Sequence, residues 1–363
     1  MRIKSITYIN HCTGWNIRDL NLGRLTLLVG ASGVGKTQIL RAISNVCEIA
    51  NGKSFNGVEW NISFTAKGSD YVWSGRFETK PNEDSSLSEK NRFVIENEKL
   101  VKGEEVIIER HDKKIVFDGK ETLKMNVTVS AVSLFQEEQL ICPVWESIWK
   151  VYQLENEDLS VSASPVMDDS EQISIDEIYE FKFLNPIGRL FLLKKRGLKE
   201  FDLIKEGFID IFPQIEDIDF TTRKLYDGKI VPILTIKEKG VEKWITNNLS
   251  AGMLRTLRQL TTLVLAQDGD VVLIDEFENG LGVNCIDILA DQINNSEKDI
   301  QYILTSHHPY IINNIPFENW RVVVRDKSDV SVMTAEELNI GTRSKHDAFM
   351  QLIQTEAYKT GKR

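Results

Sequence analysis

One short motif near the start of the chain restricts the possible folds more than any other feature. Residues 30–37 read GASGVGKT and match the pattern G-x-x-x-x-G-K-[ST] of a phosphate-binding loop. The apolar segment 25–29 precedes the motif, and the helix-like sequence QILRAI follows it. A strand, a glycine-rich turn and a helix in this order place backbone N–H groups around phosphate oxygens. The sequence therefore predicts an α/β nucleotide-binding fold.

The residue types in this loop fit a nucleoside triphosphate with a magnesium ion. Lys36 supplies a point charge for the β- and γ-phosphates, and Thr37 offers its hydroxyl to Mg²⁺. The glycines let the backbone approach the phosphates closely. The expected nucleotide-binding residues of the loop are Gly30, Ser32, Gly33, Gly35, Lys36, Thr37 and Gln38.

Length and cysteine usage indicate a globular protein that needs neither disulfides nor structural metals. The 363 residues can form one large α/β domain with an insertion, or two modest domains. Four widely spaced cysteines form no C-x-x-C pair, so we expect reduced thiols in a cytoplasmic protein. The N-terminal sequence lacks a secretory signal, and no run reaches the roughly 20 apolar residues of a membrane span. We expect no membrane contact.

The charge balance argues against a surface that attracts nucleic acid as a whole. The formal net charge is −10, whereas phosphate neutralisation requires a clustered basic face. The run KKRGLK at 194–199 leaves two interpretations open, a local DNA contact or a solvated helix face. The basic residues 359–363 are expected to fray.

The hydrophobic pattern changes character several times along the chain. Residues 57–130 contain short β-rich segments separated by turn residues, which predicts an antiparallel meander with a polar loop at 81–90. Residues 134–212 look helical, beginning with LICPVWESIWKVYQL and interrupted by a polar break at 160–170. No heptad pattern extends to three repeats, so long coiled-coil arms are not expected. The aromatic residues expected in the core here are Trp145, Trp149, Phe181, Phe183 and Phe191.

This pattern predicts a nucleotide-binding head with a helical lobe inserted between the loop and a later motif. We expect the head to comprise residues 1–133 and 215–335, with its second part alternating helices and parallel strands. The helical lobe is expected at 134–214, and a C-terminal helix with a basic tail at 336–363.

A second part of the site is predicted at residues 270–281, which read DVVLIDEFENGL. Asp275 and Glu276 follow an apolar strand, and carboxylates at the carboxyl end of a buried strand face the ligand crevice of α/β folds. Asp275 is expected to hold Mg²⁺ through its water shell, and Glu276 to polarise the attacking water. A simpler alternative is that the pair caps a helix.

Two further segments add candidate residues. Ser250 and Gly252 open a helix with apolar residues at helical spacing. Ser250 is suited to a helix N-cap, but the same helix start can also bind the γ-phosphate as an anion. His307 follows the apolar strand in YILTSHHPYII.

The order of these motifs resembles that of the ABC-type ATPases. Residues 30–37 are similar to the Walker A loop, 249–253 (LSAGM) to the signature motif LSGGQ, 271–276 to Walker B, and His307 to the switch histidine. IDEFENGL and TSHHPYII resemble the patterns of the RecF, SMC and OLD-like group, which includes ATPases of phage-defence systems. The similarity covers about 1–50 and 215–325.

Some positions depart from this resemblance. Phe277 stands where the family has proline, and LSAGM lacks the second glycine and the glutamine of the signature. The family's Q-loop glutamine, which is both a catalytic and a metal-binding residue, is assigned to Gln136, taken to follow an apolar strand. Gln139 is the rival candidate.

The resemblance implies that two copies dimerise around two ATP molecules, because the signature residues of one copy complete the site of the other. It implies a slow, Mg²⁺-dependent ATPase that acts as a switch on a nuclease or toxin in phage defence or DNA repair. A higher oligomer and DNA contact stay open. The alternatives are an ATP-assembled scaffold and a transporter subunit, although transporters have a much shorter separation than that between Lys36 and Ser250.

Overall fold

The computed structural model of the chain consists of two compact units. It describes residues 1–81, 93–154, 166–167, 178–179, 186–226, 229–246, 249–341 and 344–363. Unit 1 comprises Met1–Gln153, Gly269–Phe277 and Asp299–Arg363, and unit 2 comprises Leu154–Asp268 and Glu278–Lys298. Most of the polar segments expected at 81–90 and 160–170, with Phe181 and Phe183, lies outside the described residues. The head and lobe boundaries drawn from the sequence stay a prediction.

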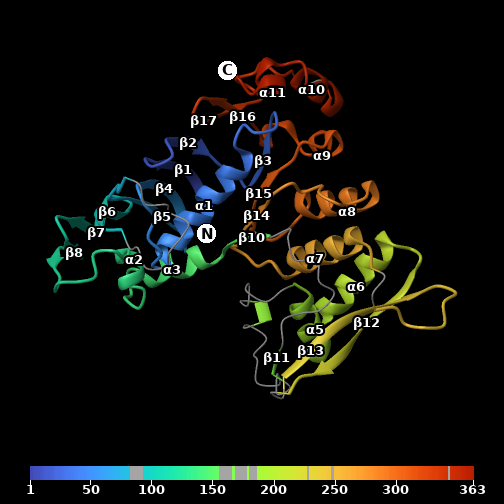
Figure 1. Cartoon of the computed structure of the whole chain (residues 1–363). Helices are drawn as coiled ribbons and strands as arrows, with labels where there is room; N and C mark the ends of the chain where they lie inside the picture. Colours follow the sequence, from blue (N-terminus) through green and yellow to red (C-terminus); the bar gives the residue numbers. More distant parts are fainter. Residues whose placement is uncertain are drawn as a thin grey trace. The chain divides into compact units, whose positions relative to one another are not determined.

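Among the described residues, unit 1 is built on a 14-stranded mixed sheet (Figure 1). Across the sheet the strands are β10 (Val151–Leu154), β14 (Val271–Ile274), β15 (Gln301–Thr305), β3 (Leu25–Val29), β16 (Trp320–Asp326), β17 (Asp329–Thr334), β2 (Trp15–Asn21), β1 (Arg2–Asn10), β4 (Val58–Ala66), β5 (Ser69–Phe77), β6 (Ile95–Lys102), β7 (Glu105–His111), β8 (Lys114–Phe117) and β9 (Lys120–Glu121). Strands β14, β15, β3 and β16 pair in parallel, whereas β1 and β4–β9 form an antiparallel meander. The expected fold class, an α/β nucleotide-binding fold with an antiparallel meander, is confirmed.

Helix α1 and the sheet form the core of unit 1. The helices of this unit are α1 (Lys36–Ala50), α2 (Ala131–Leu134), α3 (Cys142–Trp149), α9 (Pro309–Asn314), the 3-10 turn η2 (Phe317–Asn319), α10 (Lys345–Leu352) and α11 (Glu356–Thr360). Along α1, Ile39, Ile43 and Val46 recur at helical spacing and are almost fully buried. They belong to one apolar cluster with Leu28 of β3 and Leu273 of β14. Each such side chain stabilises the fold by about 1.5–3 kcal/mol.

Two expectations from the sequence, the helix that includes residues 151–154 and the strand before Gln136, are wrong. VYQL at 151–154 is strand β10, which pairs with β14, and the N–H of Val271 donates to the carbonyl of Lys150 (2.9 Å). A four-residue apolar segment fits strand or helix by its pattern, and pairing with β14 decides it here. Gln136 follows the short helix α2 and not an apolar strand. The cause is Ser130, which caps α2 by accepting from the N–H of Val132.

A buried ion pair lies within the antiparallel part of the sheet. Glu98 of β6 and Arg110 of β7 are direct cross-strand partners, and their side chains are 0% and 1% exposed. One carboxylate oxygen of Glu98 accepts from Trp73 Nε1 (3.1 Å) and Ser130 Oγ (2.5 Å), and the other accepts from the N–H of Ala131 (2.8 Å). Burial lowers the pKa of Arg110, and the neighbouring Glu98 opposes that shift.

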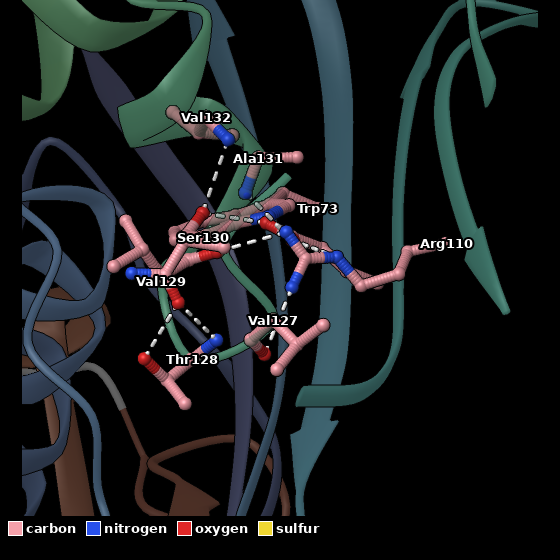
Figure 2. A network of polar contacts seen from close by, with 10 residues as sticks. Trp73, Arg110, Val127, Thr128, Val129, Ser130, Ala131 and Val132 are labelled. Atoms are coloured by element: carbon pink, nitrogen blue, oxygen red, sulfur yellow. Dashed lines mark hydrogen bonds and ion pairs between the residues drawn. The ribbon is translucent and has the colours of Figure 1, made fainter. Parts of the chain in front are cut away.

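Arg110 extends this network to the segment that leads into α2. Its guanidinium donates to the carbonyls of Val127 (3.2 Å) and Val129 (2.8 Å), as Figure 2 shows. The carbonyl of Val127 also accepts from the N–H of Ile95 (2.9 Å). A buried carboxylate and a buried guanidinium thus satisfy backbone groups that a loop would otherwise leave to water. We call the side chains of Glu98, Arg110, Trp73 and Ser130 the sheet network.

Unit 2 is a helical layer with a small sheet. Its helices are α5 (Pro186–Lys195), α6 (Lys199–Ile211), α7 (Ala251–Leu265) and α8 (Val283–Asn294), and its strands are β11 (Val166–Met167), β12 (Ile215–Lys224) and β13 (Lys229–Glu238). Helix α7 packs against the other three helices, and Phe191 of α5 is buried as expected. In the basic run, Lys194 is paired with Asp219. No helix within the described residues has the length and apolar character of a membrane span.

Candidate nucleotide-binding site

Other parts of unit 1 closely approach the loop at residues 30–35 at Gly30 and Gly35. A Cβ atom on Gly30 would lie 2.7 Å from the carbonyl oxygen of Val323, and one on Gly35 would lie 3.0 Å from the ring of Trp15. Helix α1 begins directly after this loop, at Lys36. Gly30 and Gly35 are therefore required by close contacts, and the N–H groups of a helix start follow them, as an anion site needs.

Lys36 folds back over the loop that precedes it. Its ammonium group donates to the carbonyls of Gly30 (2.8 Å) and Ala31 (2.9 Å). These bonds hold a half-buried positive charge above the loop, where a phosphate would bind. Ser32 and Gly33 are exposed, and Gln38 is half-buried within the first turn of α1.

Three side chains from separate segments meet beside the loop. Asp275 Oδ1 accepts hydrogen bonds from the hydroxyls of Thr37 (3.2 Å) and Thr305 (2.6 Å). Strands β14, β15 and β3 run in parallel, with Ile274 opposite Leu304 and Leu304 opposite Leu27, so their carboxyl ends coincide. This register brings residues far apart in the sequence to one edge. We call Thr37, Asp275 and Thr305 the phosphate cluster.

Thr305 also holds the backbone of Glu276. The N–H of Glu276 donates to Thr305 Oγ1 (2.7 Å), and the N–H of Phe277 donates to the carbonyl of Thr305 (3.0 Å). Glu276 has a φ of 47° and an exposed side chain. A left-handed backbone is unfavourable for a non-glycine residue, and such conformations concentrate at functional sites. Phe277, which replaces the family's proline, is 1% exposed and packs in the core.

The phosphate cluster fits a magnesium ion held together with a nucleotide. Mg²⁺ prefers oxygen ligands and takes few of them from the protein when phosphates supply others. A carboxylate and a threonine hydroxyl meet this need, and both side chains are half-buried at the edge of the sheet. Among the described residues, no group of three or more His, Cys, Asp or Glu side chains could hold a metal alone. The donor set suits a metal that arrives with phosphate.

The two adjacent histidines differ in their structural roles. His308 caps helix α9, since its Nδ1 accepts from the N–H of Tyr310 (3.3 Å). His307 is exposed and directly follows Ser306, whose N–H donates to the carbonyl of Leu28 at 3.2 Å. His307 is therefore anchored next to the strand that leads into the loop. The cap function of His308 leaves His307 as the candidate for a role in the site.

The structure does not bring Gln136 into the phosphate cluster. Ser133, three residues earlier, lies beside Gly52, just beyond the end of α1, whereas Lys36 and Thr37 begin that helix. Gln139 is exposed. The assignment of a catalytic and metal-binding role to Gln136 stays a prediction.

Two polar residues with contacts in this part of unit 1 were not predicted from the sequence. Thr305 is the central member of the phosphate cluster, and a polar residue at the end of a buried strand was the available signal. Gln153 lies on β10 beside β14 and accepts from Ser44 of α1 (3.1 Å). It was overlooked because VYQL was interpreted as helix.

The signature segment belongs to unit 2 and is ordered by local contacts. Ser250 is exposed and caps α7, with its Oγ accepting from the N–H of Met253 (3.1 Å). A Cβ on Gly252 would lie 2.8 Å from the carbonyl oxygen of Gly280. Arg255 Nη1 donates to Asn279 Oδ1 (2.9 Å). The start of α7 and the turn at 278–281 thus form one packed element, which fixes the helix start expected to bind a phosphate.

Fold and site together define a P-loop nucleotide-binding protein. Residues 25–313 match the family described as "AAA domain, putative AbiEii toxin, Type IV TA system". The match spans most of the chain, and the chain belongs to this family of nucleotide-binding ATPases. The assignment to the ABC-type ATPases of the RecF, SMC and OLD-like group is confirmed.

The chain is also similar to solved structures of SMC head domains. An SMC head bound to the C-terminal winged-helix domain of ScpA has 12% identity and a TM-score of 0.48, with 92% of this chain and 97% of that chain covered. An SMC head with ScpA from Pyrococcus furiosus has 14% identity and a TM-score of 0.48, with 93% and 97% covered. The SMC head of Thermotoga maritima has 12% identity and a TM-score of 0.39, with 92% and 99% covered. No curated protein sequence matches the chain.

Proposed function

We propose that this chain binds ATP with Mg²⁺, hydrolyses it slowly and uses the cycle as a switch. The observation that supports this most directly is the phosphate cluster beside the loop, where Asp275 accepts from both Thr37 and Thr305. Residues at the ends of two parallel strands, β14 and β15, meet Thr37 at the start of α1, where an anion binds. The membership in an ATPase family agrees with this reading.

Each residue of the proposed site has a chemical role. Lys36, with Gly30, Ser32, Gly33, Gly35 and Gln38, would hold the triphosphate. Thr37 and Asp275 would hold the magnesium ion, which when bound neutralises phosphate charge. Glu276 would accept a proton from the attacking water, as its carboxylate is exposed and directly follows Asp275. His307 would contact the γ-phosphate, and Gln136 is the proposed Q-loop residue.

The proposed switch is an ATP-dependent homodimer. Ser250 and Gly252 of a second copy would complete the phosphate site, so that ATP joins two chains and hydrolysis releases them. Ser250 is exposed at a helix start, which supports this role. The dimer would control a partner such as a nuclease or toxin in phage defence or DNA metabolism. The family's description, which names a type IV toxin–antitoxin system, is compatible with that role.

A second candidate is a scaffold that ATP assembles and whose turnover is incidental. The observation that favours it is the local use of the Ser250 hydroxyl as a helix cap. The two proposals differ in whether hydrolysis is needed for biological activity. A variant that binds ATP without hydrolysing it separates them.

The proposed function is tested with Glu276→Gln and Lys36→Ala. Removal of a positioned general base should lower turnover by about 10²–10⁴-fold while ATP binding persists. Lys36→Ala should lose ATP binding itself. Glu104→Gln, at an exposed turn between β6 and β7, is the matched control. Parental turnover by Glu276→Gln would overturn the assignment of the base, and ATP-dependent dimers that persist in this variant would support the switch.

A further inference from the structure

The segment after α10 lies against the phosphate-binding loop. Helix α11 packs on β16, and the carbonyl of Gly361, which ends α11, accepts from the N–H of Arg325 in β16 (2.7 Å). Residues 359–363, expected to fray, therefore include a residue tied to the central sheet. We call residues 355–361 the brace.

The brace touches the loop through Gly361. A Cβ atom on Gly361 would overlap Cγ1 of Val34 and lie 3.8 Å from Cβ of Ala31. Val34 is 5% exposed, although Ser32 and Gly33 beside it are exposed. Val34 is thus buried beside exposed residues at the position that the brace covers.

Arg325 links the loop to the brace a second time. Its backbone binds Gly361, while its guanidinium donates to the carbonyls of Gly33 (3.2 Å) and Lys327 (2.5 Å). The same guanidinium lies 4.4 Å from the centre of the Trp15 ring, which in turn contacts Gly35. A planar guanidinium makes these directed contacts together, whereas a lysine ammonium cannot reproduce the fork.

The two contacts hold the loop at Gly33 and Val34. The bonds of Lys36 hold the loop at Gly30 and Ala31. A phosphate-binding loop works by keeping several N–H groups aimed at one point, and any disorder there must be removed when the ligand binds. A contact that restricts the empty loop therefore increases affinity without touching the ligand.

We propose that the brace holds the loop in its phosphate-binding conformation, with Gly361 and Arg325 as positioning residues. The inference rests on the proposed nucleotide binding, since it assigns these residues an effect on that step. Because binding coupling is reciprocal, a nucleotide in the loop must also tighten the brace on β16. A partner that pulled the brace away would weaken ATP binding by the same factor.

The main test compares two glycines that share a left-handed φ. Gly361 has φ 70° and Gly119, in the turn between β8 and β9, has φ 71°, but a Cβ on Gly119 meets nothing within 4 Å. Gly361→Ala and Gly119→Ala therefore both place a side chain at an unfavourable φ, and only the first pushes on the loop. Gly361→Ala should raise the ATP dissociation constant about tenfold, and Gly119→Ala should change it less than about twofold.

The second test removes Cγ1 of Val34, the methyl group that a Cβ on Gly361 would overlap. In a Val34→Ala background, the effect of Gly361→Ala on ATP affinity should shrink to that of Gly119→Ala, because Cγ1 of Val34 is gone. Arg325→Lys should weaken ATP binding by about threefold to tenfold while kcat at saturating ATP changes little. A general folding defect would lower the melting temperature without nucleotide and would not be relieved by Val34→Ala.

Hydrogen exchange of peptides that contain residues 355–363 measures the reciprocal effect. Their exchange should slow when ATP binds to the parental protein, and it should not slow in Lys36→Ala. The proposed role of the brace is overturned if Gly361→Ala binds ATP as well as Gly119→Ala does, or if hydrogen exchange in residues 355–363 does not change when ATP binds. A parental protein that binds no ATP would instead overturn the proposed function, and the brace with it.

Discussion

Two polar clusters of unit 1 contain similar side chains but differ in their expected roles. The phosphate cluster has a carboxylate that accepts from two hydroxyls, Thr37 and Thr305, and its Asp275 is half-buried. The sheet network has a carboxylate that accepts from Trp73 and Ser130, and its Glu98 is fully buried. The first lies at the carboxyl ends of parallel strands, and the second lies in the middle of antiparallel ones.

The difference in exposure distinguishes a cluster that a ligand can reach from one that only stabilises the fold. Both carboxylate oxygens of Glu98 have donors within the protein, and no solvent reaches them. Around Asp275, the neighbouring Glu276 and His307 face solvent, where a ligand can reach them. A buried charge without its partner is costly, whereas a charge at an open edge can bind a ligand. Variants of the two clusters should therefore affect different measurements.

The largest expected effect on stability comes from Arg110→Met. The substitution leaves the carboxylate of Glu98 buried without its ion-pair partner, which should cost about 3–5 kcal/mol of unfolding free energy. Denaturant unfolding measures this loss. ATP turnover per folded molecule should stay near the parental value. The double variant Glu98→Gln/Arg110→Met should be more stable than Arg110→Met alone, and a less stable double variant would contradict the assignment of the loss to an unpaired charge.

Among variants of the two clusters, the largest expected effect on turnover comes from Asp275→Asn. The amide keeps an oxygen that accepts from Thr37 and Thr305 but removes the charge proposed to hold Mg²⁺. Turnover should fall about 10²–10³-fold and require more Mg²⁺, while unfolding changes little. Steady-state ATPase assays across a Mg²⁺ series measure this. Asp118→Asn, at an exposed turn, controls for the loss of one negative charge. Parental turnover in Asp275→Asn would refute the metal site.

Thr305 is expected to contribute both to stability and to turnover. Thr305→Val removes the hydroxyl that binds Asp275 and leaves the N–H of Glu276 without that acceptor. The expected losses are about 1–3 kcal/mol in unfolding free energy and roughly tenfold in kcat. Thr305→Ser keeps the hydroxyl and should retain most of both. If Thr305→Val lost stability but kept kcat, the residue would be structural only.

The smallest expected effect concerns Ser250, whose hydroxyl already has a local partner. Ser250→Ala should cost about 1 kcal/mol, because α7 loses its cap, while Ser250→Asn should keep the cap. If Ser250 also binds the γ-phosphate of a second copy, both variants should weaken ATP-dependent association. Analytical ultracentrifugation with Glu276→Gln as the background measures association. Parental association in Ser250→Asn would leave the residue with its capping role alone.

The sequence was sufficient to assign a functional segment where that segment is formed by consecutive residues. The loop at 30–37 was assigned from its glycines, its lysine and the strand and helix around it, and α1 begins at Lys36. Local pattern failed where four residues had to be assigned as helix or strand. VYQL at 151–154 became β10 only because β14 lies beside it. Gln136 was predicted to follow an apolar strand, but the segment before it is helix α2, which Ser130 caps.

The sequence alone determined the fold class, the phosphate-binding loop and the carboxylates that follow β14, since each can be recognised from the residue types and hydrophobic pattern of one short segment. Only the tertiary structure decided that Thr305 joins Asp275, that Arg110 pairs with Glu98, and that Gly361 lies against Val34. The physical reason is that strand order and helix packing are set by burial of apolar surface across the whole unit. A side chain's partner far along the chain is a consequence of that packing and not of its own neighbours.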